Sequence, residues 1–167
     1  MSKKDLKITL YYSELIYDVQ NKTYLTGRSR SDGNNFEAVA NMQANDDDEN
    51  LNQVMRSIGG AIASLRTALG EFIVETGETA TNILNIAEDG AKVELTLTMP
   101  SNYNNATRDT VASASHKFIV NTAIGDWFAI TNKADAADYI AMANANIVEL
   151  RDAINRRLRP SRKTVNL

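Results

Sequence analysis

The amino-acid sequence predicts a mainly α-helical protein: a helical bundle with a protruding β-hairpin and a basic C-terminal tail. Apolar residues recur at intervals of three and four over most of the chain, which is the spacing of one helix face. A period of two, typical of half-buried strands, is confined to residues 6–12 and 93–99. Basic residues concentrate after residue 150. We therefore predict one domain over residues 1–160, with the hairpin at about 82–99, and a basic tail over 161–167.

Composition excludes several classes of protein. The 167 residues are 43% hydrophobic and 23% charged, which is typical of a soluble globular domain. The chain has no cysteine, so it has no disulfide, thiol nucleophile or thiolate metal site. A single histidine, His116, excludes a multi-histidine metal site and disfavours a His-dependent catalytic triad. The longest apolar runs are too short to cross a membrane. We expect no enzymatic activity, no cofactor and no membrane partner.

The ionisable residues form no recognisable catalytic pattern. His116 lies in a predicted helix with no acid among its sequence neighbours to orient it, so we expect a surface or boundary residue. Two pairs of acids stand three residues apart, which is typical of a solvated helix face: Asp135 with Asp138, and Glu149 with Asp152.

The charge is distributed unevenly along the chain. The net charge is −3, but residues 151–167 carry +5 and the preceding 150 residues carry −8. An acidic body with a basic end can bind a polyanion, or can dock its end on an acidic neighbour. Self-association is the simpler interpretation because copies of one chain supply both charges.

The N-terminal region predicts a strand and then a short helix. Residues on one side of the alternating stretch are apolar: Leu6, Ile8, Leu10 and Tyr12. Ser13 is a candidate cap for a helix that begins at Glu14. Because residues 21–30 are polar, we expect this helix to be short or frayed. Residues 29–35 read as a polar loop.

An acidic run precedes the clearest helix of the first half. After a weakly helical stretch at 36–44, the four acids of residues 46–49 suit a helix start, where the helix dipole favours negative charge. A calcium site is disfavoured because the acids do not alternate and no turn glycine follows. Gly59 and Gly60 suggest a close helix crossing or a kink. The apolar stripe of the helix is Leu51, Val54, Met55, Ile58, Ile62, Leu65, Leu69 and Phe72.

Residues 82–99 predict a β-hairpin. Its second strand alternates, with Val93, Leu95, Leu97 and Met99 on the buried side. Asp89 and Gly90 supply the turn and are candidate contact residues, and 82–87 would be the incoming strand. Because a lone hairpin is marginal in water, it must pack on the helices, pair with the N-terminal strand or extend into another subunit.

The last third predicts two antiparallel helices joined by a short connection. Asn104 or Asn105 caps the first, which runs to about residue 130. Trp127 and Phe128 favour core positions over an exposed interface. Thr131 or Asn132 separates the helices. The second helix has apolar residues at Ile140, Ala143, Ile147, Leu150, Ile154 and Leu158, and Pro160 ends it.

The basic end is the one functional feature with a clear mechanism. Arg156, Arg157 and Arg159 span nearly a full turn, so on a helix they would form a collar of positive charge around its C-terminal end. This charge could complement the helix dipole, dock on another subunit or contact phosphates without sequence preference. The candidate interface or DNA-facing residues are Arg151, Arg156, Arg157, Arg159, Arg162 and Lys163.

Two stretches carry a resemblance to a known group of proteins. Residues 17–28 (YDVQNKTYLTGR) and the block 101–160, with DWF at 126–128 and RRLRP at 156–160, resemble structural proteins of tailed phages and prophages of gut Bacteroidetes, including the crAss-like group. The predicted outline is similar to that of head–tail connector proteins, the adaptor or neck rings beneath the portal.

The resemblance implies a virion structural protein at the head–tail junction, made in the host cytoplasm. Connector proteins form homo-oligomeric rings, commonly twelvefold, through head-to-tail contacts that close by rotation. The implied partners are the portal and tail proteins, with double-stranded DNA passing through the ring. The resemblance supplies no catalytic residue. Two alternatives stay open: a tail-completion or other minor virion protein, and a sequence-independent DNA-binding module that uses the basic arm.

Overall fold

The computed structural model describes residues 2–74, 77, 80 and 91–162 and confirms the predicted fold class. Over these residues the fold is mainly helical, with one antiparallel pair of strands. The elements are β1 (Lys4–Tyr11), α1 (Tyr12–Ser29), α2 (Phe36–Met42), α3 (Asp48–Ala68), β2 (Lys92–Met99), the 3-10 turn η1 (Asn105–Thr107), α4 (Arg108–Thr131) and α5 (Lys133–Ile154).

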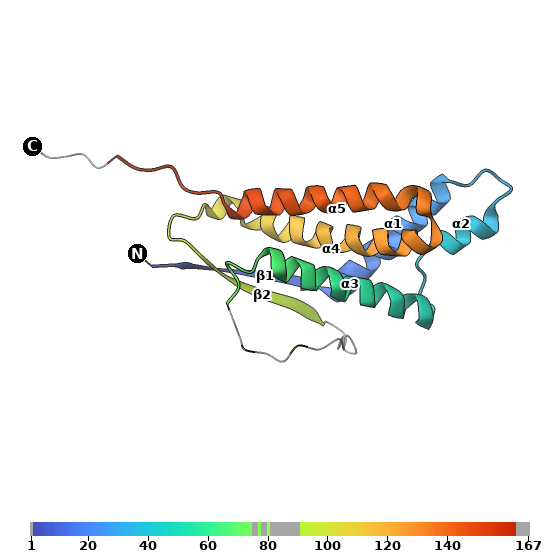
Figure 1. The fold of residues 1–167 in the computed structure, drawn as a ribbon, viewed down its shortest axis with the longest axis horizontal. Helices are drawn as coiled ribbons and strands as arrows, with labels where there is room; N and C mark the ends of the chain where they lie inside the picture. Colours follow the sequence, from blue (N-terminus) through green and yellow to red (C-terminus); the bar gives the residue numbers. More distant parts are fainter. Residues whose placement is uncertain (1, 75–76, 78–79, 81–90, 163–167) are drawn as a thin grey trace, which may run out of the picture.

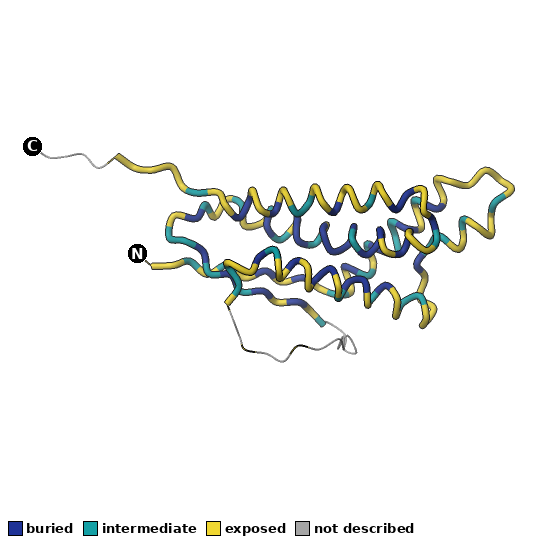
Figure 2. The backbone as a smooth tube through the Cα atoms, in the orientation of Figure 1, coloured by how far each residue is buried: buried dark blue, intermediate teal, exposed yellow. Residues whose placement is uncertain are grey.

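Helix α4 is the centre of the bundle. Helices α1, α3 and α5 and strand β1 all pack on it, and α5 lies along its whole length (Figure 1). Half of its residues are buried, and they lie on more than one side of the helix, as Ile119, Val120 and Ile124 show. A helix that is apolar all round is expected only where neighbours cover it on several sides. Figure 2 shows the buried backbone concentrated along α4 and on the inner sides of α3 and the sheet.

The strand predicted at 93–99 pairs with the N-terminal strand. Strands β1 and β2 are antiparallel, and Lys7 faces Thr96 in the register. Ile8 and Leu97 are buried on the inner face, whereas Lys7 and Thr9 are exposed on the outer one. Of the three placements that the sequence left open, the structure shows this one. The predicted incoming strand 82–87 and the turn at Asp89 and Gly90 lie outside the described residues.

The opposite edge of β2 is also covered, by the segment that follows α3. The amide of Thr98 donates to the carbonyl of Phe72 at 2.7 Å, and the amide of Val74 donates to the carbonyl of Thr96 at 3.1 Å. The C-terminal half of β2 therefore has backbone partners on both sides, and these two bonds anchor residues 72–74 at the sheet.

The prediction of a short or frayed first helix was wrong, because α1 continues to Ser29. Its buried stripe is Leu15, Val19, Thr23 and Gly27, at intervals of four. The second half of the stripe is not apolar in composition. Thr23 is buried because its hydroxyl donates to the carbonyl of Val19 at 2.8 Å and accepts from the amide of Ala44 at 3.0 Å. Gly27 is buried because a Cβ there would lie 3.1 Å from the carbonyl oxygen of Val39.

A close helix crossing lies at Gly125. Gly60, one of the two glycines at which the sequence suggested a close crossing or a kink, does not lie at a close crossing. A Cβ on Gly60 would have no atom within 4 Å, and α3 runs through it as a continuous helix. A Cβ on Gly125 would lie 3.0 Å from Cγ1 of Ile140, where α4 crosses α5. A small residue is needed at position 125 because α4 and α5, which pack along their whole length, approach each other closely there.

We expect different effects from adding a methyl group at these two glycines. Gly60→Ala should raise the free energy of unfolding by about 0.5–1 kcal/mol, because alanine favours a helix interior and the site is open. Gly125→Ala should not give this gain, because the methyl group would lie 3.0 Å from Cγ1 of Ile140 and the cost of that close contact offsets the gain in helix propensity. Urea unfolding followed by circular dichroism measures both. An equal effect of the two substitutions would contradict the assigned crossing.

Candidate functional site

The basic segment leaves the bundle as an arm and not as a helix end. Helix α5 ends at Ile154, four residues before the predicted end at Leu158. The chain then pairs with the segment before α4: the amide of Leu158 donates to the carbonyl of Asn102 at 2.7 Å, and the amide of Asn104 donates to the carbonyl of Arg156 at 3.1 Å. Beyond this pairing the chain leads away from the body at one end of the long axis (Figure 1).

The predicted collar of arginines around a helix end is therefore wrong. Arg156, Arg157 and Arg159 follow the helix, because backbone pairing with residues 102–104 replaces its next turn. Arg156 bonds Asp152 at 2.8 Å, and Arg157 donates to the carbonyl of Ile154 at 2.9 Å. These two arginines thus hold the base of the arm.

The remaining arginines of the predicted set are exposed. Arg151 lies on the last turn of α5, and Arg159 and Arg162 lie on the arm. Among the described residues none of the three has an acidic partner in an ion pair. Lys163 lies outside the described part of the chain. Arg159 and Arg162 are therefore the exposed charges of the described part of the arm that no acidic side chain in that part of the structure neutralises.

The opposite end of the molecule is acidic. Helix α3 begins at Asp48, so the acidic run opens this helix as predicted, and α3 starts at the end of the bundle that lies farthest from the arm (Figure 1). Asp46 accepts from the side chain of Gln20 at 2.6 Å. Asp47, Asp48 and Glu49 are exposed and form no ion pair with any described lysine or arginine. This end therefore carries uncompensated negative charge.

A hollow of about 450 Å³ has Asp47, the first of these three carboxylates, among its lining residues. Its walls come from three parts of the chain that meet there: the end of α2 with the link to α3, the first turns of α3, and the end of α4. Ile130 stands at the hollow with 67% of its surface exposed. The lining is otherwise largely polar: Asn41, Gln43, Asn45, Asp47, Asn50, Gln53 and Thr131.

The sequence did not identify this hollow. The acidic run was interpreted as a helix start, and nothing linked it to Ile130, more than 80 positions further along the chain. One signal is visible in retrospect: residues 41–53 contain six Asn or Gln side chains and no Lys or Arg.

Trp127 is one of the residues that line the hollow. It is buried, as predicted for it and for Phe128, and its indole N–H donates to the carbonyl of Met42 at 2.8 Å. This hydrogen bond ties the end of α2 to α4. The wall formed by α2 and the link to α3 is therefore fixed against the central helix.

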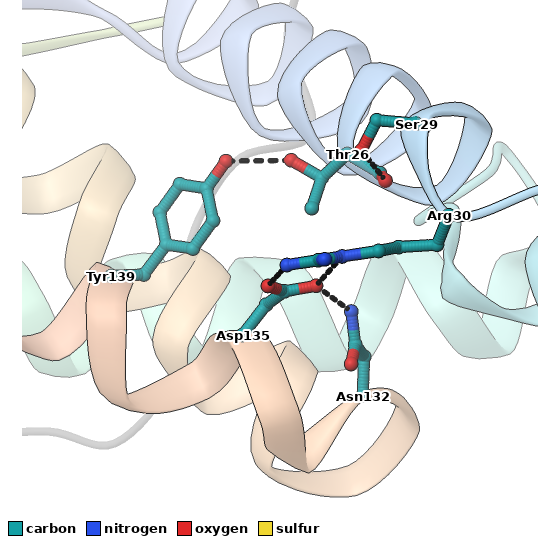
Figure 3. Close-up of polar contacts among 6 residues, drawn as sticks. All are labelled: Thr26, Ser29, Arg30, Asn132, Asp135 and Tyr139. Carbon is teal, nitrogen blue, oxygen red and sulfur yellow. Dashed lines mark hydrogen bonds and ion pairs between the residues drawn. The ribbon is translucent and has the colours of Figure 1, made fainter.

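A polar clasp joins the end of α1 to the start of α5 (Figure 3). The guanidinium of Arg30 donates to both carboxylate oxygens of Asp135, and the side chain of Asn132 donates to the same carboxylate at 2.5 Å. Beside it, the hydroxyls of Thr26 and Tyr139 are 2.7 Å apart. Asp135 is only 4% exposed, so the expectation of a solvated helix face was wrong for this residue. Its partner Arg30 stands 105 positions away in sequence.

Acid should weaken this clasp. The Arg30 guanidinium holds the pKa of Asp135 below its ordinary value of 3.8, and Asn132 adds to the effect. A carboxyl group whose pKa is lower in the folded state stabilises the fold above the ordinary pKa, and this contribution is lost as the pH falls through the folded pKa. Asp135→Asn should lower the free energy of unfolding by about 2 kcal/mol at neutral pH, the scale of a hydrogen bond to a charged group.

The clasp is tested by the difference in the free energy of unfolding between the wild-type protein and Asp135→Asn. This difference should shrink below about pH 4, where the Asp135 carboxyl group of the unfolded wild-type chain begins to take up protons, and it should be lost as the pH falls through the lower pKa of the folded state. Desolvation raises the pKa of Asp126, which acts in the opposite direction, but both chains share that residue, so its effect cancels. Urea unfolding at a series of pH values measures the difference. A difference that stays constant down to pH 2 would contradict the assigned role of Asp135.

His116 also has an acidic partner that its sequence neighbours did not reveal. Its Nε2 lies 2.6 Å from Oδ2 of Asp18 on α1, which links α1 to α4. His116 is half-buried, as expected for a boundary residue. A shallow groove between α1, α4 and α5 lies nearby, with Lys22, Lys117, Leu25 and Met142 among its lining residues.

Two further observations concern metals and membranes. Within residues 2–74, 77, 80 and 91–162, no group of three or more acidic or histidine side chains is placed to hold a metal ion. No helix in this part of the chain combines the length and the hydropathy of a membrane span.

Comparison with known proteins finds no family model, no curated protein and no solved structure that matches this chain.

Proposed function

We propose that this protein is a virion structural protein of a tailed phage, a head–tail connector that joins the portal to the tail by assembling with copies of itself. The observation that carries the proposal is the placement of opposite charges at opposite ends of one elongated bundle. The exposed arginines of the arm lie at one end. At the other end lie the carboxylates of residues 47–49, which form no ion pair with any lysine or arginine that the structure describes.

A bundle with opposite charges at its two ends favours head-to-tail association. In a heterologous contact the two sides of the interface are different surfaces, so each copy uses one end on each of two neighbours. A closed ring results when the rotation between neighbours divides a full turn evenly, with no rise along the axis, and an open helical filament results otherwise. The resemblance of residues 17–28 and 101–160 to phage structural proteins favours the ring.

Two contacts that join the ends of helices support an assembly role. The clasp of Arg30 with Asp135 and the bond from Trp127 to Met42 fix the ends of α1, α2 and α5 relative to α4. In a ring of many identical subunits, the two ends of each subunit must keep the same distance and orientation relative to each other.

Mass photometry of the purified chain, alone and mixed with the portal protein encoded in the same genome, tests this function. The proposal predicts a high oligomer in at least one of the two samples. A chain that stays monomeric alone and never associates with the portal would overturn it. A gene position next to the portal and terminase genes is the expected genomic context.

A further inference from the structure

We propose that the basic arm of one copy docks in the hollow beside Asp47 of the next copy, with Arg159 and Arg162 facing Asp47 and the exposed carboxylates that follow it at the start of α3. The inference rests on the proposed function and names the two surfaces that would make its repeating contact.

The arm and the hollow complement each other in charge. The described part of the arm beyond Leu158 contains two arginines and no acid, and both arginines are exposed. Residues 43–53, which form the link to α3 and its first turns, contain four carboxylates and no base. None of these four carboxylates forms an ion pair with any residue the structure describes. Opposite potentials on two surfaces favour their encounter and set their register.

The hollow has the size and chemistry to accept a segment of chain. Its volume of about 450 Å³ falls in the range of pockets that hold ligands. The amide side chains of its walls can donate to and accept from an extended backbone. Ile130 adds an exposed apolar contact, and Leu158 at the base of the arm is 50% exposed. A guanidinium can bind a carboxylate through two parallel hydrogen bonds, which gives direction to the contact.

The two arginines cannot reach the hollow of their own copy. The hollow lies beside the start of α5, and the arm begins at its end, so the 22 residues of α5 separate them by roughly 33 Å. Residues 156–158 are held by backbone pairing with 102–104, which leaves four residues from Arg159 to Arg162. Four extended residues span about 14 Å at most. The partner of the arm is therefore another molecule.

DNA is the competing partner for the arm, but it does not fit the hollow. Phosphates would be repelled by the carboxylates of residues 47–49, whereas a basic segment would be attracted. A second copy of this chain offers an acidic partner to the arm and a basic partner to the hollow.

A charge-exchange experiment on the full chain tests the contact. Asp47→Lys with Asp48→Lys alters the hollow, and Arg159→Glu with Arg162→Glu alters the arm. Each double variant should weaken self-association at least about tenfold, because it places like charges opposite each other, and the two combined should restore much of it. Sedimentation velocity measures the association. The control is Asp138→Lys with Glu149→Lys, which makes the same change in net charge on the exposed side of α5 and should have no effect.

A peptide measurement gives an answer that does not depend on whole-particle assembly. A fluorescein-labelled peptide of residues 155–167 is titrated into the full chain that carries Arg159→Glu and Arg162→Glu, whose own arm cannot compete. We expect saturable binding, weakened about tenfold by adding Asp47→Lys and Asp48→Lys to the receptor chain and unchanged by the α5 control.

The outcomes separate the docking contact from the proposed function. No peptide binding, or binding that ignores the hollow substitutions, overturns the contact. Self-association that persists in both double variants also overturns it and leaves the connector function standing. Loss of DNA affinity in the arm variant, with self-association and peptide binding unchanged, assigns the arm to nucleic acid and overturns the contact. Absence of any association, with or without the portal, overturns the connector function itself.

Discussion

Phe128→Ala should lower the free energy of unfolding by about 4 kcal/mol, because it removes a fully buried aromatic ring from the central helix. Phe128 is 0% exposed and meets Tyr139 of α5 edge to face, with the ring centres 5.4 Å apart. The substitution therefore leaves a cavity between the two helices that pack along their whole length, and it also removes an aromatic pair.

Ile130→Ala is the matched control for this prediction. Ile130 lies two residues further along the same helix and also loses a large side chain, but 67% of its surface is exposed. We expect a change within about 0.5 kcal/mol, as for an ordinary surface substitution. Urea unfolding of both variants, with wild-type m-values required for comparison, measures the effect. Similar losses in the two variants would contradict the assignment of α4 as the core helix.

A disulfide between β1 and β2 should stabilise the fold by about 2–4 kcal/mol when it is oxidised. Lys7 and Thr96 stand directly opposite each other in the register, and a bridge between them would close a loop of most of the chain. Because the chain has no cysteine, Lys7→Cys with Thr96→Cys creates one defined pair. Thermal unfolding with and without a reductant measures the gain.

The control for the disulfide places the two cysteines at positions that do not face each other in the register. Asp5 faces Thr98, so Asp5→Cys with Glu94→Cys places the two thiols four residues apart along the strands, about 13 Å. That distance is too long for a disulfide without movement of the backbone. Ready oxidation of the control pair, or its failure in the Lys7 and Thr96 pair, would contradict the pairing of β1 with β2.

The helices that the sequence predicted well are those whose buried side chains are apolar. The stripe from Val54 to Leu65 placed α3, and the acidic run placed its start at the correct residues. The second half of α1 was missed because Thr23 and Gly27 occupy its buried positions. Thr23 is buried through hydrogen bonds and Gly27 through close backbone approach, and neither property appears in a hydropathy pattern.

The candidate site was predicted only where its residues are adjacent in sequence. The arginines of the arm stand close together in the chain, so composition revealed them, although pairing with residues 102–104 ended the helix earlier than its apolar spacing indicated. The hollow and the clasp join residues that are far apart. The sequence predicted Asp135 to be a surface acid because its partner Arg30 stands 105 positions away in the chain. Such contacts depend on how the helices pack, and a single sequence contains no direct record of that.

Electron microscopy of the purified chain with its portal protein tests the central claim, that this protein acts by repeating one contact between its two oppositely charged ends. The account predicts closed rings in which adjacent subunits meet arm to hollow, and which fall apart when Arg159 and Arg162 are both changed to Glu. Rings whose subunits meet along the side of α5, with the arms and hollows empty, would contradict it, and so would particles that contain no copy of the chain.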